Sequence, residues 1–327
     1  TVVGDTVRRS KKTLPSVRIK WEKDSYTQGL TWEEVFFKLI YIDGFAVPST
    51  PLKANAGVPE RGTTVSCSRQ YIENNIASKY LNNAETAIFT KLSHGCSVTI
   101  DDWLAEGDPI GEGDFSEGVV PIIDMIRGTT QEITHSTRRG SVAFYLGIDH
   151  GDFWKVAQML YEDPDGLNIG WLISDDFVNK LKSGDKDAIE RWNRVLYIRL
   201  AKGRGYLTKT DTMNRNKAQT FKNLDLYIKG SNLCNELNLP ANDEYSATCV
   251  ILNANLALYD HFPEHLFQLL HIMQDCNVGG YLKQIEGMKK HTRDLMKKAY
   301  NFTKDFRAVG TGTLGLHSLF MKKRIVY

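Results

Sequence analysis

The chain has 327 residues, of which 24% are charged and 42% hydrophobic, values typical of globular proteins. This composition excludes a disordered, collagen-like or coiled-coil chain. Because 41 basic residues are balanced by 39 acidic ones, the formal net charge of +2 gives no indication of nucleic-acid binding.

The first 45 residues combine a basic arm with one helical pattern. Residues 1–20 carry six basic side chains and a single acid, which favours a solvated arm over a phosphate-binding one. Apolar residues recur at helical spacing over 32–40, and Thr31 with Glu34 has the signature of a capping box. We therefore expect a helix that begins at Thr31 and ends before Gly44.

The middle of the chain alternates between strand and helix patterns. Short β-branched or apolar runs predict strands, and longer amphipathic runs predict helices. In chain order we expect a strand at 62–68, a helix at 69–92, a glycine-rich mobile loop at 107–118, a helix at 119–126, a strand at 141–148, a helix at 152–161, a strand at 168–174, a helix at 185–201 and the end of a strand at 205–208. This alternation predicts an α/β fold with a mainly parallel sheet.

The last third is predicted to be rich in helices. The patterns indicate helices at 262–275 and 284–306, and a short alternating strand in the segment ATCVILN around position 249. No run of about 18 apolar residues occurs, so we expect no membrane span and a cytoplasmic location, in the host cytoplasm if the protein is viral.

The five cysteines, at positions 67, 96, 234, 249 and 276, show neither C-x-x-C pairs nor regular spacing. This pattern indicates a reducing compartment rather than a disulfide framework or a zinc site. The histidines form no convincing metal-binding set, so we predict no metal in this chain.

The segment SNLCNELNLP at 231–240 carries an amide, a thiol and a carboxylate at alternate positions, in Asn232, Cys234 and Glu236. In an extended loop alternate side chains project to one side, so we expect the three groups to face one pocket. Negative charge raises the pKa of a neighbouring thiol, so this trio suits hydrogen-atom or proton transfer better than nucleophilic attack by a thiolate. The alternative is a structural cysteine in a polar loop.

The N-x-C-x-E pattern in this segment, which is followed by a second cysteine, resembles the finger loop of ribonucleotide reductase large (catalytic) subunits. Further segments resemble the same family in the same order: PSTP at 48–51, NAG at 55–57, SC at 66–67, RRGS at 138–141 and RAVGTGTLGLHSL at 307–319. The last of these resembles the glycine-rich start of a helix after the finger.

The resemblance implies a fold and a domain organisation. Residues 46–327 would form the first half of the ten-stranded α/β barrel of this family, with the finger loop around 228–240 and flanking helices. Residues 1–45 would be an N-terminal arm and the remnant of a helical domain. Complete members of the family continue well beyond the glycine-rich motif, so we expect one piece of a split or truncated, viral or phage-type large subunit.

The resemblance also implies roles for the residues of the finger and for two cysteines. Cys234 would become the thiyl radical that abstracts the ribose 3′-hydrogen, with Glu236 as general base on the 3′-hydroxyl and Asn232 bound to the 2′-hydroxyl side. Cys67 and Cys249 would be the dithiol that supplies electrons and closes to a disulfide. Such a bridge needs Cα atoms about 4.4–6.8 Å apart, so these two cysteines should lie on adjacent strands.

Two hydroxyl residues would bind the substrate phosphate. The resemblance assigns this role to Thr50 and Ser66, and hydroxyls beside backbone amides suit phosphate oxygens. Cys96 and Cys276 match no family position and are expected to be structural.

The resemblance implies that the radical originates outside this chain. A class I enzyme takes it from a metal-containing small subunit, and a class II enzyme takes it from adenosylcobalamin; we favour class I. Nucleotide effectors are expected as well. The implied partners are a complementary C-terminal large-subunit fragment, the small subunit, thioredoxin or glutaredoxin, and a second copy of the chain bound through helices within 69–126. No nucleic-acid or membrane partner is expected.

Two other functions remain open at this stage. A non-catalytic nucleotide-binding regulator would keep the barrel without turnover, but it would have little need for all three cysteines together with Asn232 and Glu236. A cysteine-dependent hydrolase would need a histidine near Cys234 and a lowered thiol pKa, which Glu236 disfavours.

Overall fold

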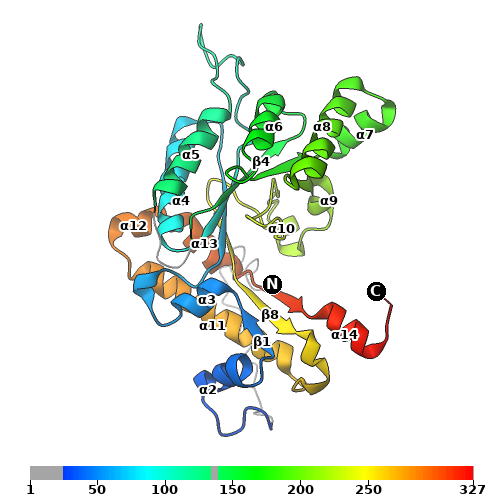
Figure 1. Ribbon diagram of the computed structural model, residues 1–327. Coiled ribbons are helices and arrows are strands. Elements are labelled where there is room, and N and C mark those ends of the chain that lie inside the picture. Colours follow the sequence, from blue (N-terminus) through cyan, green and yellow to red (C-terminus); the bar gives the residue numbers. More distant parts are fainter. Residues whose placement is uncertain (1–24, 134–138, 327) are drawn as a thin grey trace.

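The computed structural model describes residues 25–133 and 139–326 (Figure 1). The strands of these ranges form a six-stranded sheet with the order β6-β5-β4-β3-β2-β7 and a three-stranded sheet with the order β1-β8-β9. The strands are β1 (Ala46–Pro48), β2 (Cys67–Tyr71), β3 (Gly95–Thr99), β4 (Val142–Gly147), β5 (Ile169–Ile173), β6 (Tyr206–Lys209), β7 (Ala247–Cys249), β8 (Ile251–Asn255) and β9 (Gly310–Leu314).

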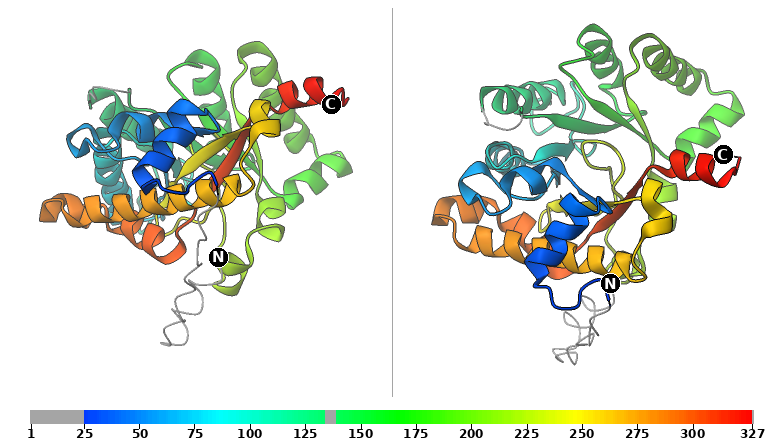
Figure 2. Two further views of the ribbon diagram at one scale, coloured as in Figure 1. Left: turned by 90° about the horizontal axis from the view of Figure 1, so that it is seen from below. Right: turned by 60° about the horizontal axis from the view of Figure 1, so that its bottom comes forward.

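Helices connect the strands and cover the outside of the curled larger sheet (Figure 2). No helix of the described ranges combines the length and the apolar character that a bilayer crossing requires. The helical elements are α2 (Trp32–Phe37), η1 (Lys38–Ile42), α3 (Thr50–Asn55), η2 (Pro59–Arg61), α4 (Ile76–Lys91), α5 (Val120–Glu132), α6 (Phe153–Glu162), α7 (Asp175–Ser183), α8 (Lys186–Lys202), α9 (Thr210–Arg215), α10 (Gln219–Asn223), η3 (Leu256–His261), α11 (Leu266–Glu286), α12 (Lys290–Leu295), α13 (Lys297–Phe306) and α14 (Leu316–Lys323).

The larger sheet is parallel from β2 to β6, and β7 joins its end antiparallel to β2. Parallel neighbours require crossover connections, which helices such as α4, α5, α6 and α8 provide. The predicted α/β fold is therefore confirmed, in the form of a curled half-barrel.

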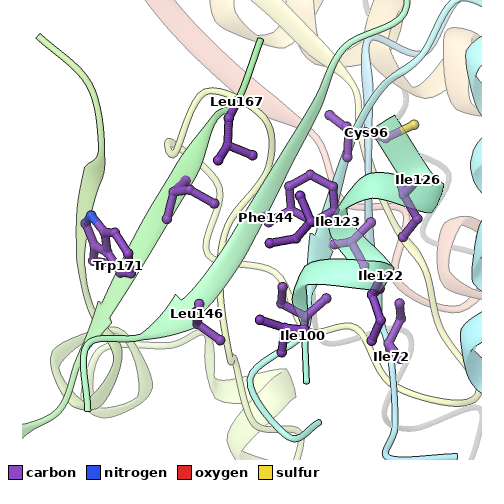
Figure 3. Close-up of a cluster of buried hydrophobic side chains, with 14 of the residues drawn as sticks. Ile72, Cys96, Ile100, Ile122, Ile123, Ile126, Phe144, Leu146, Leu167 and Trp171 are labelled. Atoms are coloured by element: carbon purple, nitrogen blue, oxygen red, sulfur yellow. The ribbon is translucent and has the colours of Figure 1, made fainter. Parts of the chain in front are cut away.

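The main core lies between the outer face of this sheet and its helices (Figure 3). Phe144 and Leu146 of β4 point outward and are fully buried against α5, which contributes Ile122, Ile123 and Ile126. Because side chains alternate along a strand, Tyr145 between them points to the inner face. Helices thus cover the outer face of the sheet, and the inner face remains available for contact with another segment of the chain.

A second core joins the N-terminal helix to the smaller sheet. The capping box at its start is present as predicted: the Glu34 amide donates to Thr31 Oγ1 at 3.3 Å, and the Thr31 amide donates to Glu34 Oε2 at 2.8 Å. Val35 and Leu39 then pack against residues of β8 and α11, among them Leu252. The basic residues 1–20 lie outside the described residues.

The strand and helix predicted at 62–68 and 69–92 have the wrong boundary. The strand β2 runs from Cys67 to Tyr71, and helix α4 does not begin until Ile76. The polar residues Arg69 and Gln70 obscure the strand pattern, yet both are buried: Arg69 contacts the loop at Leu239, and Gln70 contacts α4 at Asn82. The strand β3 was not predicted, since Ser97 and Thr99 mask its apolar residues.

Three predictions for the C-terminal third also need correction. The glycine-rich segment begins with strand β9, which pairs in parallel with β8, and its helix α14 starts only at Leu316. The helix predicted at 284–306 is divided among the end of α11, α12 and α13. The segment ATCVILN is divided at Val250 between two sheets, because β7 pairs with β2 whereas β8 pairs with β1 and β9.

We predict that truncating the outer core at Leu146 destabilises the fold strongly. The side chain is fully buried, so Leu146→Ala removes apolar contacts and leaves a cavity, at a cost of about 2–5 kcal/mol. Leu200→Ala is the matched control, because Leu200 is 89% exposed and its loss should change stability by less than about 0.5 kcal/mol. Urea unfolding measures both, and equal effects would contradict this description of the core.

Candidate functional site

The loop 228–240 lies on the inner face of the half-barrel, within the arc of strands (right view of Figure 2). Gly230 allows this close approach: a Cβ atom at this position would lie 2.7 Å from Thr99 Oγ1 and 3.1 Å from Tyr145 Cγ. Both distances are shorter than ordinary contacts, so a larger residue would push the loop away from the sheet. We call 228–233 the outgoing arm and 236–240 the return arm.

The inner face of the sheet holds the outgoing arm through its backbone carbonyls. Ser97 Oγ on β3 donates to the Ser231 carbonyl at 2.7 Å, and the Tyr145 hydroxyl on β4 donates to the Asn232 carbonyl at 2.6 Å. Buried carbonyl groups need such partners, because an unpaired one costs free energy. The loop backbone is therefore fixed in one position on the sheet.

The tip of the loop is a turn and not the extended segment that the alternating pattern predicted. The Asn235 amide donates to the Asn232 carbonyl at 3.1 Å, and Asn235 has a φ of +65°. Asparagine tolerates this left-handed conformation better than most residues. The Asn235 side chain is held in turn, since its Oδ1 accepts a hydrogen bond from Thr208 at 2.8 Å.

This turn brings the predicted amide and carboxylate into direct contact. Asn232 Nδ2 donates to Glu236 Oε1 at 2.7 Å. Asn232 Oδ1 in turn accepts hydrogen bonds from the Glu236 and Leu237 amides at 3.0 and 3.1 Å. The fully buried Asn232 side chain therefore orients a carboxylate that is itself solvent-exposed.

Cys67 and Cys249 face each other on adjacent strands, as predicted. They are direct register partners in the antiparallel pair β2–β7, and both are buried. Partners in antiparallel strands have Cα atoms about 4.5 or 5.5 Å apart, which lies inside the range that a disulfide requires. No disulfide joins the two cysteines in the structure.

Cys234 and Glu236 lie close enough to this pair to act on it electrostatically. Burial raises the pKa of the Cys249 thiol well above its ordinary value, and negative charge on Cys67, Glu236 and Cys234 raises it further. Leu233 of the loop packs in one apolar cluster with Cys67 and Cys249. The arrangement therefore joins an exposed thiol, an oriented carboxylate and a buried pair of thiols.

The other predicted residues belong to several different elements. Ser66 immediately precedes β2, and its amide donates to the Cys249 carbonyl at 3.3 Å, whereas Thr50 is exposed at the first position of α3. Cys96 is buried in the outer core, and Cys276 is exposed on α11. The described ranges contain no group of three or more His, Cys, Asp or Glu side chains placed to hold a metal. Arg138, at the start of the RRGS segment, lies outside them.

Sequence reasoning missed the residues that hold the loop in place, among them Ser97, Tyr145 and Thr208. A signal for them exists: in the run GCSVTI, polar residues alternate with apolar ones that pack on the outer helices. The signal is weak, because both faces of this sheet are buried and the strand shows no exposed side.

Comparisons with known proteins all identify relatives among the ribonucleotide reductases. The profile of the family described as ribonucleotide reductase, barrel domain, matches residues 65–189 and 184–327. A Frog virus 3 protein named as a ribonucleoside-diphosphate reductase large subunit is 26% identical over 307 residues, which is 87% of this chain. The corresponding protein of Invertebrate iridescent virus 3 is 32% identical over 183 residues, or 55% of this chain.

Among solved structures, the chain is similar to an Actinobacillus ureae class Id ribonucleotide reductase alpha subunit. The TM-score is 0.79 over 90% of this chain, at 23% sequence identity. The chain spans 54% of that subunit, 52% of the frog virus protein and 28% of the iridescent virus protein. It thus corresponds to about half or less of the length of these relatives.

We predict that mild oxidation of the reduced chain joins Cys67 to Cys249. Their cross-strand register permits the bond without movement of the backbone. Peptide mapping under non-reducing conditions should show this pair; Cys67→Ser should abolish it, and Cys96→Ser, which changes another buried thiol, should not. A dominant disulfide between any other two cysteines would contradict the assigned pair.

We also predict that Cys249 makes stability fall as the pH rises above 9. The unfolded chain releases this proton near the ordinary pKa of 9.0, whereas the folded protein retains it because burial raises the pKa. The unfolded state then binds fewer protons, so the free energy of unfolding decreases, by at most about 1.4 kcal/mol per pH unit for one group. Urea unfolding at pH 8–10 should show a shallower decline in Cys249→Ser, and identical slopes would count against the buried thiol.

Proposed function

The chain belongs to the ribonucleotide reductase barrel-domain family, and from this premise we propose that it is the catalytic half-barrel of a ribonucleotide reductase. It would convert ribonucleotides to deoxyribonucleotides for DNA synthesis by thiyl-radical chemistry. One observation carries the proposal: the finger loop places Cys234 and the Asn232–Glu236 pair beside the cross-strand cysteines Cys67 and Cys249.

Each thiol has a separate task in the proposed reaction. Cys234, exposed at the tip of the loop, takes the 3′-hydrogen of the ribose as a thiyl radical and later returns it. Cys67 and Cys249 supply two electrons and two hydrogens, so that ribonucleotide and dithiol give deoxyribonucleotide, disulfide and water. Burial supports this division, because it keeps Cys249 as a neutral thiol that can donate a proton.

Glu236 and Asn232 would handle the hydroxyl groups of the sugar. Glu236 is exposed and is oriented by the Asn232 amide at 2.7 Å, a geometry suited to a general base on the 3′-hydroxyl. Asn232 would bind the 2′-hydroxyl side, and Thr50 with Ser66 would bind the phosphate. The last two lie at the starts of α3 and β2, so they would act from outside the finger.

We further propose that a complementary C-terminal half completes the barrel. In the sheets of the described residues, β6 and β9 each pair with one neighbour and leave their other edge open. Open edges favour pairing with further strands, which would also cover the inner face beside the finger. These further strands would come either from a separate chain or from the remainder of a longer chain. A split enzyme corresponds to the first alternative.

The radical would come from a metal-containing small subunit, as in class I enzymes. The similarity to a subunit named as class Id supports this choice over adenosylcobalamin. Thioredoxin or glutaredoxin would reduce the Cys67–Cys249 disulfide, and nucleotide effectors would regulate turnover. The need for a reductant follows from the proposed reaction, because the dithiol has to be regenerated after each cycle.

A second copy of the chain would bind at helix α4. Its outer surface exposes three large apolar side chains, with Ile76 at 64%, Tyr80 at 57% and Leu81 at 61%. An apolar patch on one helix face is a common feature of protein–protein interfaces. This position agrees with a homodimer formed through helices within 69–126.

We predict that Cys234→Ser abolishes nucleotide reduction and leaves nucleotide binding nearly intact. Serine cannot form the thiyl radical, whereas the change is small and exposed. Glu236→Gln should retain binding and lower kcat by about 10²–10⁴-fold, the usual contribution of a general base. Reductase assays and equilibrium binding of a nucleotide, on the chain assembled with a C-terminal half and a small subunit, measure both. Full turnover by Cys234→Ser would contradict the radical assignment.

The same assay distinguishes the radical source. Turnover that requires the small subunit supports class I, and turnover that requires only added adenosylcobalamin supports class II. If neither supports turnover while effector nucleotides still bind, the chain is better described as a nucleotide-binding regulator.

A further inference from the structure

Arg69 is a buried cation on the inner face of the half-barrel, two residues beyond Cys67. Its side chain is 1% exposed, and none of the ion pairs found among the described residues includes it. Its Nε atom is buried without a hydrogen-bond partner. Burial lowers the pKa of this guanidinium to about 10, which reflects the cost of desolvating a charge that no carboxylate offsets.

The guanidinium binds the return arm of the finger loop directly and is linked to the outgoing arm through Thr99. Arg69 Nη1 donates to the Leu239 carbonyl on the return arm at 2.8 Å. Arg69 Nη2 donates to Thr99 Oγ1 at 3.3 Å, and Thr99 itself donates to the Lys229 carbonyl on the outgoing arm at 3.5 Å. The chain between these two carbonyls contains Cys234 and the Asn232–Glu236 pair.

The return arm depends on Arg69 more than the outgoing arm does. Ser97 and Tyr145 hold the outgoing arm directly on the sheet. The other side-chain hydrogen bonds to the return arm within the described residues come from Ser231 and Asn232, which belong to the loop itself. Arg69 is thus the sheet residue that holds the arm carrying Glu236.

We propose that Arg69 is a positioning residue that closes the neck of the finger loop and thereby fixes Glu236 relative to Cys234. The planar guanidinium suits this task, because its fixed fork of donors binds two acceptors at once, whereas the ammonium of lysine is a flexible point charge. The consequence for catalysis rests on the proposed function; the structural role does not.

Hydrogen–deuterium exchange on the isolated full chain tests the structural role without any activity. In Arg69→Met, loss of a hydrogen bond from a charged donor should speed exchange of the return-arm amides roughly ten- to hundredfold, with much less change in 231–233. Arg191→Met is the matched control: Arg191 also donates to two backbone carbonyls, those of Ile148 and His150, and its loss should leave the finger unchanged.

Two further variants keep the test decisive if Arg69→Met does not fold. Arg69→Lys keeps the charge but loses the fork, and Thr99→Val removes the link to the outgoing arm; each should speed return-arm exchange, less than Arg69→Met does. Return-arm exchange within about twofold of the wild type in any folded Arg69 variant overturns the proposal. An increase in amide exchange that is spread evenly over the whole chain also overturns the proposal, because it indicates a general loss of stability.

The assembled enzyme supplies the catalytic readout. Arg69→Met should lower kcat about tenfold with little change in KM, because substrate contacts remain while the base is misplaced, and Arg69→Lys should restore part of the loss. Equal losses in kcat and 1/KM would overturn the positioning role. If the wild-type assembly shows no turnover, the proposed function fails, but the exchange experiment still decides the role of Arg69.

Discussion

The site depends on one constraint: an irregular loop is buried inside a half-barrel, so its backbone polar groups need partners there. The inner face of the sheet meets this need with short polar side chains, and Ser97 and Tyr145 take the carbonyls of consecutive loop residues. Space is limited as well. The Tyr145 ring projects inward only because its neighbour on β5 is Gly170, where a Cβ atom would collide with it. The composition of the inner face is thus determined by the loop it holds.

The same burial gives the thiols two different environments. Cys67 and Cys249 are buried on adjacent strands, and burial favours the neutral thiol of Cys249 by raising its pKa. Cys234 stands exposed at the tip of the turn. One loop and one strand pair therefore create two environments for identical chemical groups, and the proposed radical thiol and reducing dithiol would need those two environments.

Arg69 is a charged side chain that is buried on the same inner face and binds the same loop. A buried guanidinium without a carboxylate is costly, and an apolar side chain of similar volume would avoid that cost. The bonds of Arg69 to Leu239 and Thr99 connect the arm that carries Glu236 to the strand that carries Cys67. The positions of Glu236 and of the Cys67–Cys249 pair are in this way set by the same strand, β2.

Local sequence pattern was enough to predict the groups of the loop and much of the alternation of elements. The spacing in SNLCNE, the capping box at Thr31 and the strands β4 and β5 can all be predicted from it, because short-range spacing encodes them. Tertiary structure alone decided the boundary of β2, the turn at Asn235, the division at Val250 and the burial of Arg69. Each of these depends on pairing or packing with a segment far away in the chain, and such contacts leave no periodic trace in the local sequence.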